Sequence, residues 1–303
     1  MTMPNFLIFG AQKSGTTTLA DHLSKHPQVY MSPMKEPGFF DFENRTPDFK
    51  GPKDKELYQH MVTDLAAYQG LFSGVTDEQA IGEATTWYLY SQQAPVRIKH
   101  YLPDVKLIAI LRNPVDRAYS AFLHARRDDR ETVHNFVEAL DQEDARIAQN
   151  WEYLWRYKQM GFYFPQLSRY FEQFPPAQIR IYLFDDLSAR PTELLDDICD
   201  FLEIDAALMP EISKRYNVSG IPKNRLLHNL VVSQDSLVKR AIRPFIPSEA
   251  VRQQIRSRIS KRNLSKPEMS AEAREKLVGV YREDVAKLET LIDRDLSHWL
   301  AVS

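Results

Sequence analysis

Two glycines five residues apart, Gly10 and Gly15, lie between an apolar run and a threonine-rich helix start. The apolar run, residues 6–9, is typical of a buried strand. A glycine-bounded loop between a strand and a helix directs backbone N–H groups inward, and the helix adds the positive end of its dipole. The pattern predicts a cradle for a phosphate-like anion.

The end of this loop departs from the nucleotide-binding P-loop. Gly15 is followed by Thr16 instead of a lysine, and the only cation inside the loop is Lys13. In the usual motif the lysine follows the second glycine directly and reaches the outer phosphates. We therefore expect the loop to hold an anionic ligand whose charge is neutralised differently from that of ATP.

A second cation is predicted at the same edge of the fold. Residues 105–111 read as an interior parallel strand that ends in Arg112, where an NTPase would carry a metal-binding aspartate. Ligands of open α/β sheets bind at the carboxyl ends of strands, so Arg112 should lie beside the glycine-bounded loop. Ser120 follows two helical turns later, and its hydroxyl could share the same phosphate. We assign no metal site.

Strand-like and helical patterns alternate along the chain. Apolar runs predict strands at residues 29–31, 105–111 and 179–184, and helical patterns occupy 114–126, 136–148 and 163–174. Another helical stretch runs from Ser270, a predicted N-cap, to Leu300. The alternation predicts an α/β, P-loop-like three-layer fold with a central parallel sheet flanked by helices, in one domain over residues 1–303.

Composition limits the class of protein. The chain has 303 residues and a formal net charge of −2, which argues against bulk binding of nucleic acid. Cys199 is the only cysteine, so no intramolecular disulfide forms, and its apolar helical surroundings predict a buried thiol. No signal peptide or membrane-spanning run is evident, and we expect a cytoplasmic protein.

The segment 222–265 is basic and amphipathic. It is interpreted as a lid over the acceptor, or as an interfacial helix that makes a peripheral contact with anionic lipid. A helix packed on the core with a solvated basic face is the third interpretation. The sequence leaves these open.

The loop and the Arg112 motif together resemble the PAPS-dependent sulfotransferases, and most closely the heparan-sulfate-type branch and its bacterial relatives. Residues 10–19 are similar to the family's 5′-phosphosulfate loop, and residues 111–120 are similar to its 3′-phosphate motif. Further similarity lies in residues 35–41, 161–163 and 270–300. The resemblance covers nearly the whole chain.

The resemblance implies 3′-phosphoadenosine 5′-phosphosulfate (PAPS) as co-substrate, without a metal. It implies that the 5′-phosphosulfate is held by Lys13, Ser14, Gly15, Thr16 and Thr17. It places Arg112 and Ser120 at the 3′-phosphate. Lys223 and Arg225, in a segment that matches the family's nucleotide-covering loop, either add phosphate contacts or are simply solvated.

The same resemblance assigns catalytic roles. Glu36 occupies the position of the branch's catalytic glutamate and would take the acceptor's proton. Lys13 would neutralise charge on the leaving oxygen. Sulfuryl transfer to a hydroxyl of a carbohydrate, a glycolipid or another secondary metabolite is the expected reaction. A P-loop kinase or NTPase, and a non-catalytic, membrane-associated nucleotide-binding protein, are the alternatives.

Two departures from the branch leave the acceptor open. Gly38 stands where glycosaminoglycan-sulfating members commonly carry a histidine, and Ala84 stands where they carry a lysine. Both changes remove groups that would meet a polyanionic acceptor. Trp87, Tyr88 and Tyr90 are either a sugar-stacking wall or core aromatics.

Other polar residues are weaker candidates for a functional site. Asp185 and Asp186 follow a strand but suit a turn or a helix cap. None of the histidines considered as bases lies in a matching motif, and we interpret them as structural residues: His22, His26, His100 and His124.

Overall fold

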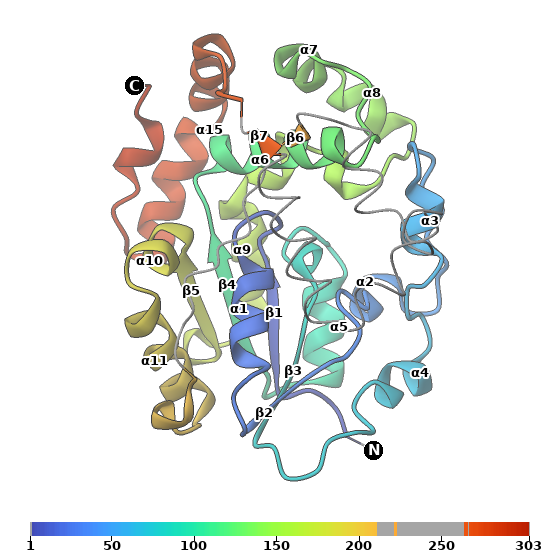
Figure 1. The fold of residues 1–303 in the computed structure, drawn as a ribbon, viewed down its shortest axis with the longest axis vertical. Coiled ribbons are helices and arrows are strands. Elements are labelled where there is room, and N and C mark those ends of the chain that lie inside the picture. Colours follow the sequence, from blue (N-terminus) through green and yellow to red (C-terminus); the bar gives the residue numbers. More distant parts are fainter. Residues whose placement is uncertain (1, 211–220, 223–263, 266, 303) are drawn as a thin grey trace, which may run out of the picture.

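The computed structural model describes residues 2–210, 221–222, 264–265 and 267–302 (Figure 1). Five strands form one sheet in the order β2-β3-β1-β4-β5, and all of its pairings are parallel. The strands are β1 Phe6–Gly10, β2 Val29–Met31, β3 Ala80–Ala84, β4 Lys106–Leu111 and β5 Ile179–Leu183. The predicted parallel sheet is therefore confirmed.

Helices lie on both faces of the sheet (Figure 1). On the side nearer the viewer are α1 Thr16–Leu23, α10 Phe184–Ala189 and α11 Pro191–Leu202. The far face and the carboxyl edge carry α5 Ala94–Tyr101, α6 Pro114–Arg127, α9 Tyr163–Gln173 and α15 Ala271–Ile292. Shorter helices are α2 Phe39–Phe42, α3 Asp54–Tyr58, α4 Leu65–Gly70, α7 Phe136–Asp141 and α8 Glu143–Ala148.

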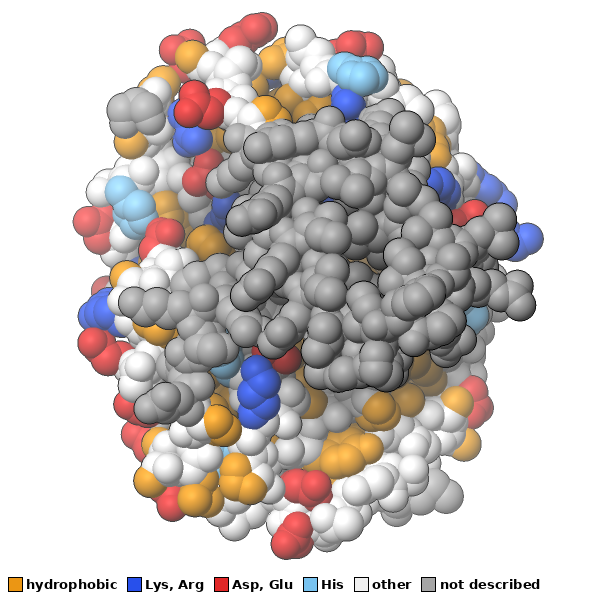
Figure 2. Space-filling model, in the orientation of Figure 1, with side chains coloured by type: hydrophobic (Ala, Val, Ile, Leu, Met, Phe, Trp, Pro, Cys, Tyr) orange, Lys and Arg blue, Asp and Glu red, His pale blue; other side chains and the backbone are white. Residues whose placement is uncertain are grey.

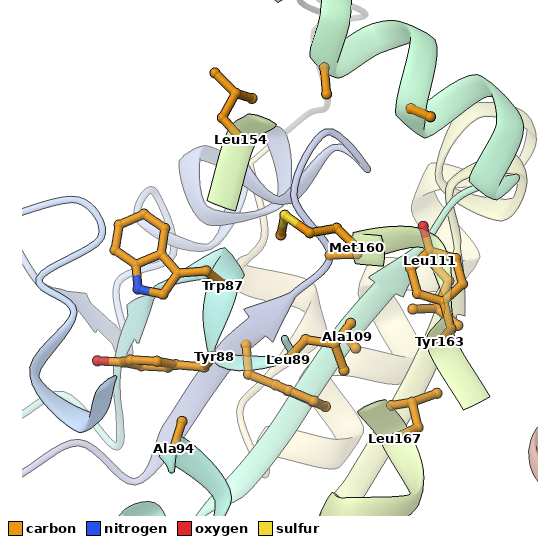
Figure 3. Packing of buried hydrophobic residues seen from close by; sticks show 14 of the residues in the cluster. Trp87, Tyr88, Leu89, Ala94, Ala109, Leu111, Leu154, Met160, Tyr163 and Leu167 are labelled. Carbon is orange, nitrogen blue, oxygen red and sulfur yellow. The ribbon is translucent and has the colours of Figure 1, made fainter. Parts of the chain in front are cut away.

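The alternation of side chains along the strands builds two apolar layers. Ile8 of β1 belongs to the same buried cluster as Leu19 of α1 and Ile198 of α11. Leu7, one residue earlier, points to the opposite layer, which includes Leu167 of α9. Figure 3 shows this second layer, with residues of β4 facing residues of α9. The predicted three-layer arrangement is confirmed.

Strand β3 is the one that the apolar runs do not reveal. Its centre is Gly82 and Glu83, neither of which is typical of a buried strand. A Cβ on Gly82 would lie 2.2 Å from the ring of Phe6, so a larger residue there would displace the neighbouring strand. Packing, and not strand propensity, explains the glycine.

Two predicted helices are shorter than expected. The stretch 136–148 is interrupted at Gln142, and the carboxylate of Glu143 turns inward to accept from the backbone N–H groups of Lys158 and Gln159. Ser270 caps α15 as predicted, with its hydroxyl accepting from the N–H of Ala273. That helix ends before Asp293, whose φ of 51° stops it well short of residue 300.

Of the segment 222–265, the structure describes only its two ends. The short strands β6 Ile221–Pro222 and β7 Leu264–Ser265 pair antiparallel and lie next to α6 (Figure 1). Figure 2 shows acidic and basic side chains interspersed on the described surface, in keeping with the small net charge. Among the described residues, no helix has the length and apolar character that crossing a bilayer requires.

Candidate donor and catalytic site

The loop between β1 and α1 has the geometry of an anion cradle. Gly15 is the N-cap of α1 and has a φ of 92°, a conformation that glycine adopts without strain. No described group accepts a hydrogen bond from the backbone N–H of Gly15, Thr16 or Thr17. These donors at the helix start fit the oxygens of a phosphate or sulfate.

Lys13 lies half-buried in this loop with a left-handed backbone, φ 70°. Burial, and after it the nearby charge of Arg127, lower the pKa of its ammonium to about 8. Asp128 and Glu36 act in the opposite direction. No described carboxylate lies within 4.0 Å of the Lys13 ammonium, whose positive charge thus has no direct partner.

Arg112 lies directly beside the loop. Its guanidinium donates to the carbonyl of Lys13 at 3.1 Å and packs over the ring of Phe184. The hydroxyl of Tyr163 donates to the carbonyl of Arg112 at 3.0 Å and fixes the end of β4. No ion pair to Arg112 occurs within the described residues, so the loop that carries Lys13 is bound by a second cation that has no carboxylate partner there.

The other described residues assigned to the donor lie on the loop, at the start of α1 and on α6. Ser14 and Thr16 are buried, Thr17 is exposed at the helix start, and Ser120 is buried on α6. Lys223 and Arg225 lie outside the described residues. The structure thus gathers the loop, Arg112 and α6 at one edge of the sheet.

Glu36 lies in the loop between β2 and α2. Its carboxylate accepts from the hydroxyl of Thr86 at 2.8 Å, and its backbone N–H donates to the carbonyl of Ala84. Like Lys13, it has a left-handed backbone, with φ 53°. Such a conformation costs about 1–3 kcal/mol and persists where surrounding contacts hold it, which is frequent at functional sites.

The structure explains why residue 38 is a glycine. Gly38 has a φ of 75° and is the N-cap of α2. A Cβ at this position would lie 2.8 Å from the sulfur of Met61 and 3.3 Å from the ring of Trp87. A histidine would require these neighbours to move, so the departure noted in the sequence is built into the packing.

A buried carboxyl lies beside Glu36. Glu83 is fully buried on β3 and accepts from the hydroxyls of Thr85, at 2.8 Å, and Tyr68, at 3.3 Å. Burial and, to a smaller extent, the charge of Glu36 raise the pKa of Glu83 to about 7, against the hydrogen bonds from Thr85 and Tyr68, which lower it. Glu83 therefore binds a proton much more readily than an exposed carboxyl.

Sequence reasoning missed the surroundings of Lys13 on α6. Arg127 is the strongest charged neighbour of Lys13 and lies 2.6 Å from a ring nitrogen of His124. Burial and the charge of Lys13 lower the pKa of His124. His124 and Arg127 lie more than a hundred positions from the loop in sequence. The one local signal is that they are about one helical turn apart on α6, which places them side by side.

The remaining residues that the sequence singled out have contacts typical of residues that stabilise the fold. Trp87 and Tyr88 are buried core residues, as Figure 3 shows, whereas Tyr90 is half-buried. Asp186 accepts from the N–H of Leu183 and pairs with arginines, as a helix-start residue does. Cys199 is buried, as predicted. No group of three or more metal-ligating side chains occurs among the described residues.

This fold and site define an α/β protein with an anion-binding loop at the carboxyl edge of its sheet, and comparison with known proteins gives the family. The sulfotransferase domain model matches residues 3–289. The chain therefore belongs to the sulfotransferase family and is a sulfotransferase, which confirms the resemblance to the PAPS-dependent enzymes and favours sulfuryl transfer over kinase chemistry. Membership supports PAPS as the co-substrate.

A solved structure agrees over the full length. The sulfotransferase from Alicyclobacillus acidocaldarius superposes with a TM-score of 0.79 at 34% sequence identity, covering 99% of this chain and 100% of that one. This similarity confirms the fold.

Curated relatives match over part of their length. A membrane-associated sulfotransferase, kil1, from Dictyostelium discoideum is 23% identical over 77% of this chain and 63% of its own. Human heparan sulfate glucosamine 3-O-sulfotransferase 3B1 is 32% identical over 66% of this chain and 46% of its own. The chain thus spans less than two thirds of the length of these relatives.

Proposed function

We propose that this sulfotransferase moves a sulfuryl group from PAPS to a hydroxyl of a carbohydrate, a glycolipid or another secondary metabolite. The observation that carries the proposal is the hydrogen bond from the Arg112 guanidinium to the backbone of the loop that holds Lys13, beside N–H groups of the α1 start that have no acceptor among the described residues. PAPS carries one anionic group at each end of its ribose, and two separate cationic positions fit this arrangement.

In this proposal the loop holds the 5′-phosphosulfate. The backbone N–H groups of Gly15, Thr16 and Thr17 and the hydroxyl of Ser14 would donate to its oxygens. Arg112 and Ser120 would hold the 3′-phosphate, and Lys223 and Arg225 are proposed as further phosphate contacts. Bound in this way, PAPS supplies an activated sulfuryl group.

Glu36 is proposed as the base and Lys13 as the group that meets the leaving oxygen. Glu36 takes the proton of the acceptor hydroxyl as that oxygen forms its bond to sulfur. Lys13 stabilises the negative charge that develops as the bond from sulfur to the nucleotide oxygen breaks. The hydrogen bond from Thr86 orients the Glu36 carboxylate, and the electrostatic influence of Glu36 on Lys13 supports their placement at one site.

The role of Glu36 is tested by replacing Glu36 with Gln. Transfer of labelled sulfate from PAPS to acceptors in a cell extract should fall by about a hundredfold or more, because the general base is removed. Affinity for the product nucleotide, 3′-phosphoadenosine 5′-phosphate (PAP), should stay within about twofold, because Glu36 does not hold the donor.

Glu56→Gln, an exposed carboxylate change on α3, is the matched control and should leave both quantities unchanged. Transfer at near-normal rate in Glu36→Gln would reject Glu36 as the base. Loss of transfer on adding a metal chelator would reject the metal-free mechanism.

A further inference from the structure

A cavity of about 770 Å³ lies outside the donor site. It is formed by residues 41–49 after the start of α2, by residues 90–93 and by the chain from residue 150 to the first turns of α9. Neither Lys13 nor Glu36 lines it. Its volume suits a small molecule of sugar size or somewhat larger.

Buried aromatic residues separate the cavity from the catalytic residues. The carboxylate of Glu36 is bound by Thr86, and the next residue, Trp87, packs against Tyr58 with ring centroids 5.8 Å apart. Tyr58 in turn packs at 4.8 Å on Phe49, which lines the cavity. The cavity therefore has a lining distinct from the donor site, and packed aromatic rings lie between Phe49 and the residues around Glu36.

Three arginines, Arg45, Arg156 and Arg169, line this cavity. The Arg156 guanidinium donates to the hydroxyl of Tyr90 at 2.9 Å and lies over the rings of Tyr90 and Tyr153. No carboxylate of the described residues lies within 4.0 Å of Arg156, and its buried Nε has no acceptor among them. Arg156 is held in place without being neutralised.

Arg169 and Arg45 add to the positive charge. Arg169 donates to the carbonyls of Leu89 and Tyr90, and its buried Nε also has no described acceptor. Arg45 donates to the backbone carbonyl of Asp41, and half of its side chain is exposed. Because their described contacts are to neutral oxygens, the guanidinium groups of Arg156 and Arg169 keep their charge available to a ligand, and Arg45 is only partly compensated by Asp41 at 4.0 Å.

Of the two aspartates of the lining, Asp41 lies 4.0 Å from the guanidinium of Arg45, and the charges of Arg156 and Arg169 are left without a paired carboxylate among the described residues. The carboxylate of Asp41 is buried and accepts from Ser91 at 2.6 Å and from Tyr153 at 2.8 Å, and burial raises its pKa. Asp48 is largely exposed and pairs with Lys50 at 2.5 Å. Neither carboxylate bridges directly to Arg156 or Arg169.

We propose that this cavity binds a sugar-sized ligand that carries a sulfate or phosphate ester. The guanidinium groups suit the ester oxygens, which they bind in paired hydrogen bonds. The faces of Tyr90 and Phe162 and the amides of Gln92 and Gln93 suit the ring and hydroxyls of a sugar. The site is independent of donor binding and does not rest on the proposed roles of Lys13 and Glu36.

The test uses glucose 6-phosphate, glucose 6-sulfate and glucose as probes in isothermal titration calorimetry. At least one ester should bind saturably, with glucose at least tenfold weaker, and the stronger ester identifies the ligand class. Arg156→Gln should weaken ester binding by about tenfold to a hundredfold, the effect of losing a charged hydrogen-bond donor. PAP binding by the same variant should be unchanged, which also shows that it is folded.

Two further variants keep the proposal open to refutation. Arg190→Gln, which removes an exposed arginine far from the cavity, should leave ester binding unchanged, and Lys13→Ala should do so as well. If Arg156→Gln lowers stability, Arg45→Gln replaces it, because that side chain is half exposed. Absence of ester binding, equal binding of glucose, or loss of ester binding when PAP is present would overturn the proposal.

Discussion

Basic side chains in two regions of this molecule differ in whether a carboxylate pairs with them. Behind α6, Arg130 pairs with Asp54 and with Glu152, the latter at 2.8 Å, and all three are buried. Arg146 pairs there with Glu131 through two hydrogen bonds. At the carboxyl edge of the sheet, Lys13 and Arg112 have no such carboxylate partner among the described residues.

This difference in pairing distinguishes arginines that stabilise the fold from cations that are available to a ligand. A buried cation needs a partner because its desolvation is otherwise uncompensated, and the pairs behind α6 satisfy this within the fold. At the sheet edge the compensation is missing from the described residues, and burial lowers the pKa of Lys13 to about 8. A cation that the fold desolvates and leaves without an anion marks a place where a ligand supplies one.

The largest effect should come from breaking a paired cation. Arg130→Ala leaves Asp54 and Glu152 buried without their counter-charge and should lower the free energy of unfolding by about 3–5 kcal/mol in urea titrations. Arg190→Ala, which removes exposed pairs to Asp186 and Glu193, should cost at most about 1 kcal/mol. Equal losses in the two variants would remove the distinction between the regions.

A smaller effect, on ligand binding instead of stability, is expected at the unpaired edge. Arg112→Gln should weaken PAP binding by about tenfold to a hundredfold, because a charged donor to the 3′-phosphate is lost. Adenosine 5′-monophosphate lacks that phosphate and should bind both forms of the enzyme equally. A parallel loss for both nucleotides would show that Arg112 supports the loop and does not read the 3′-phosphate.

Local sequence predicts one part of the site well. The strand before Gly10, the glycine-bounded loop and the strand that ends in Arg112 depend on contiguous residues, and the parallel sheet brings them together. The break at Gln142 depends instead on the bonds that Glu143 makes with residues fifteen positions later. The sequence pattern within the predicted helix does not indicate such contacts.

The surroundings of the proposed catalytic residues also depend on tertiary contacts. Arg127 affects the charge of Lys13 from a distant part of the sequence, and Gly38 is favoured by its φ of 75° and by the close approach of Met61 and Trp87. Of the aromatic residues after β3, Tyr90 lines the arginine-rich cavity whereas Tyr88 is buried. Their adjacency in sequence cannot separate these roles.

The affinity of PAP as a function of pH, for the wild type and Lys13→Ala, tests the central claim most directly. With a pKa of about 8, Lys13 is charged below that pH and loses its proton above it. Since the anion binds the charged form, wild-type affinity should be nearly full below about pH 7.5 and fall by more than tenfold by about pH 9.5, where the nucleotide phosphates no longer titrate.

Lys13→Ala should bind PAP about a hundredfold more weakly near neutral pH, and its affinity should be almost independent of pH in this range. Lys25→Ala, an exposed lysine paired with Asp21, should behave like the wild type. If Lys13→Ala instead keeps the wild-type affinity and the wild-type pH profile, Lys13 does not hold the donor and the account of this site is wrong.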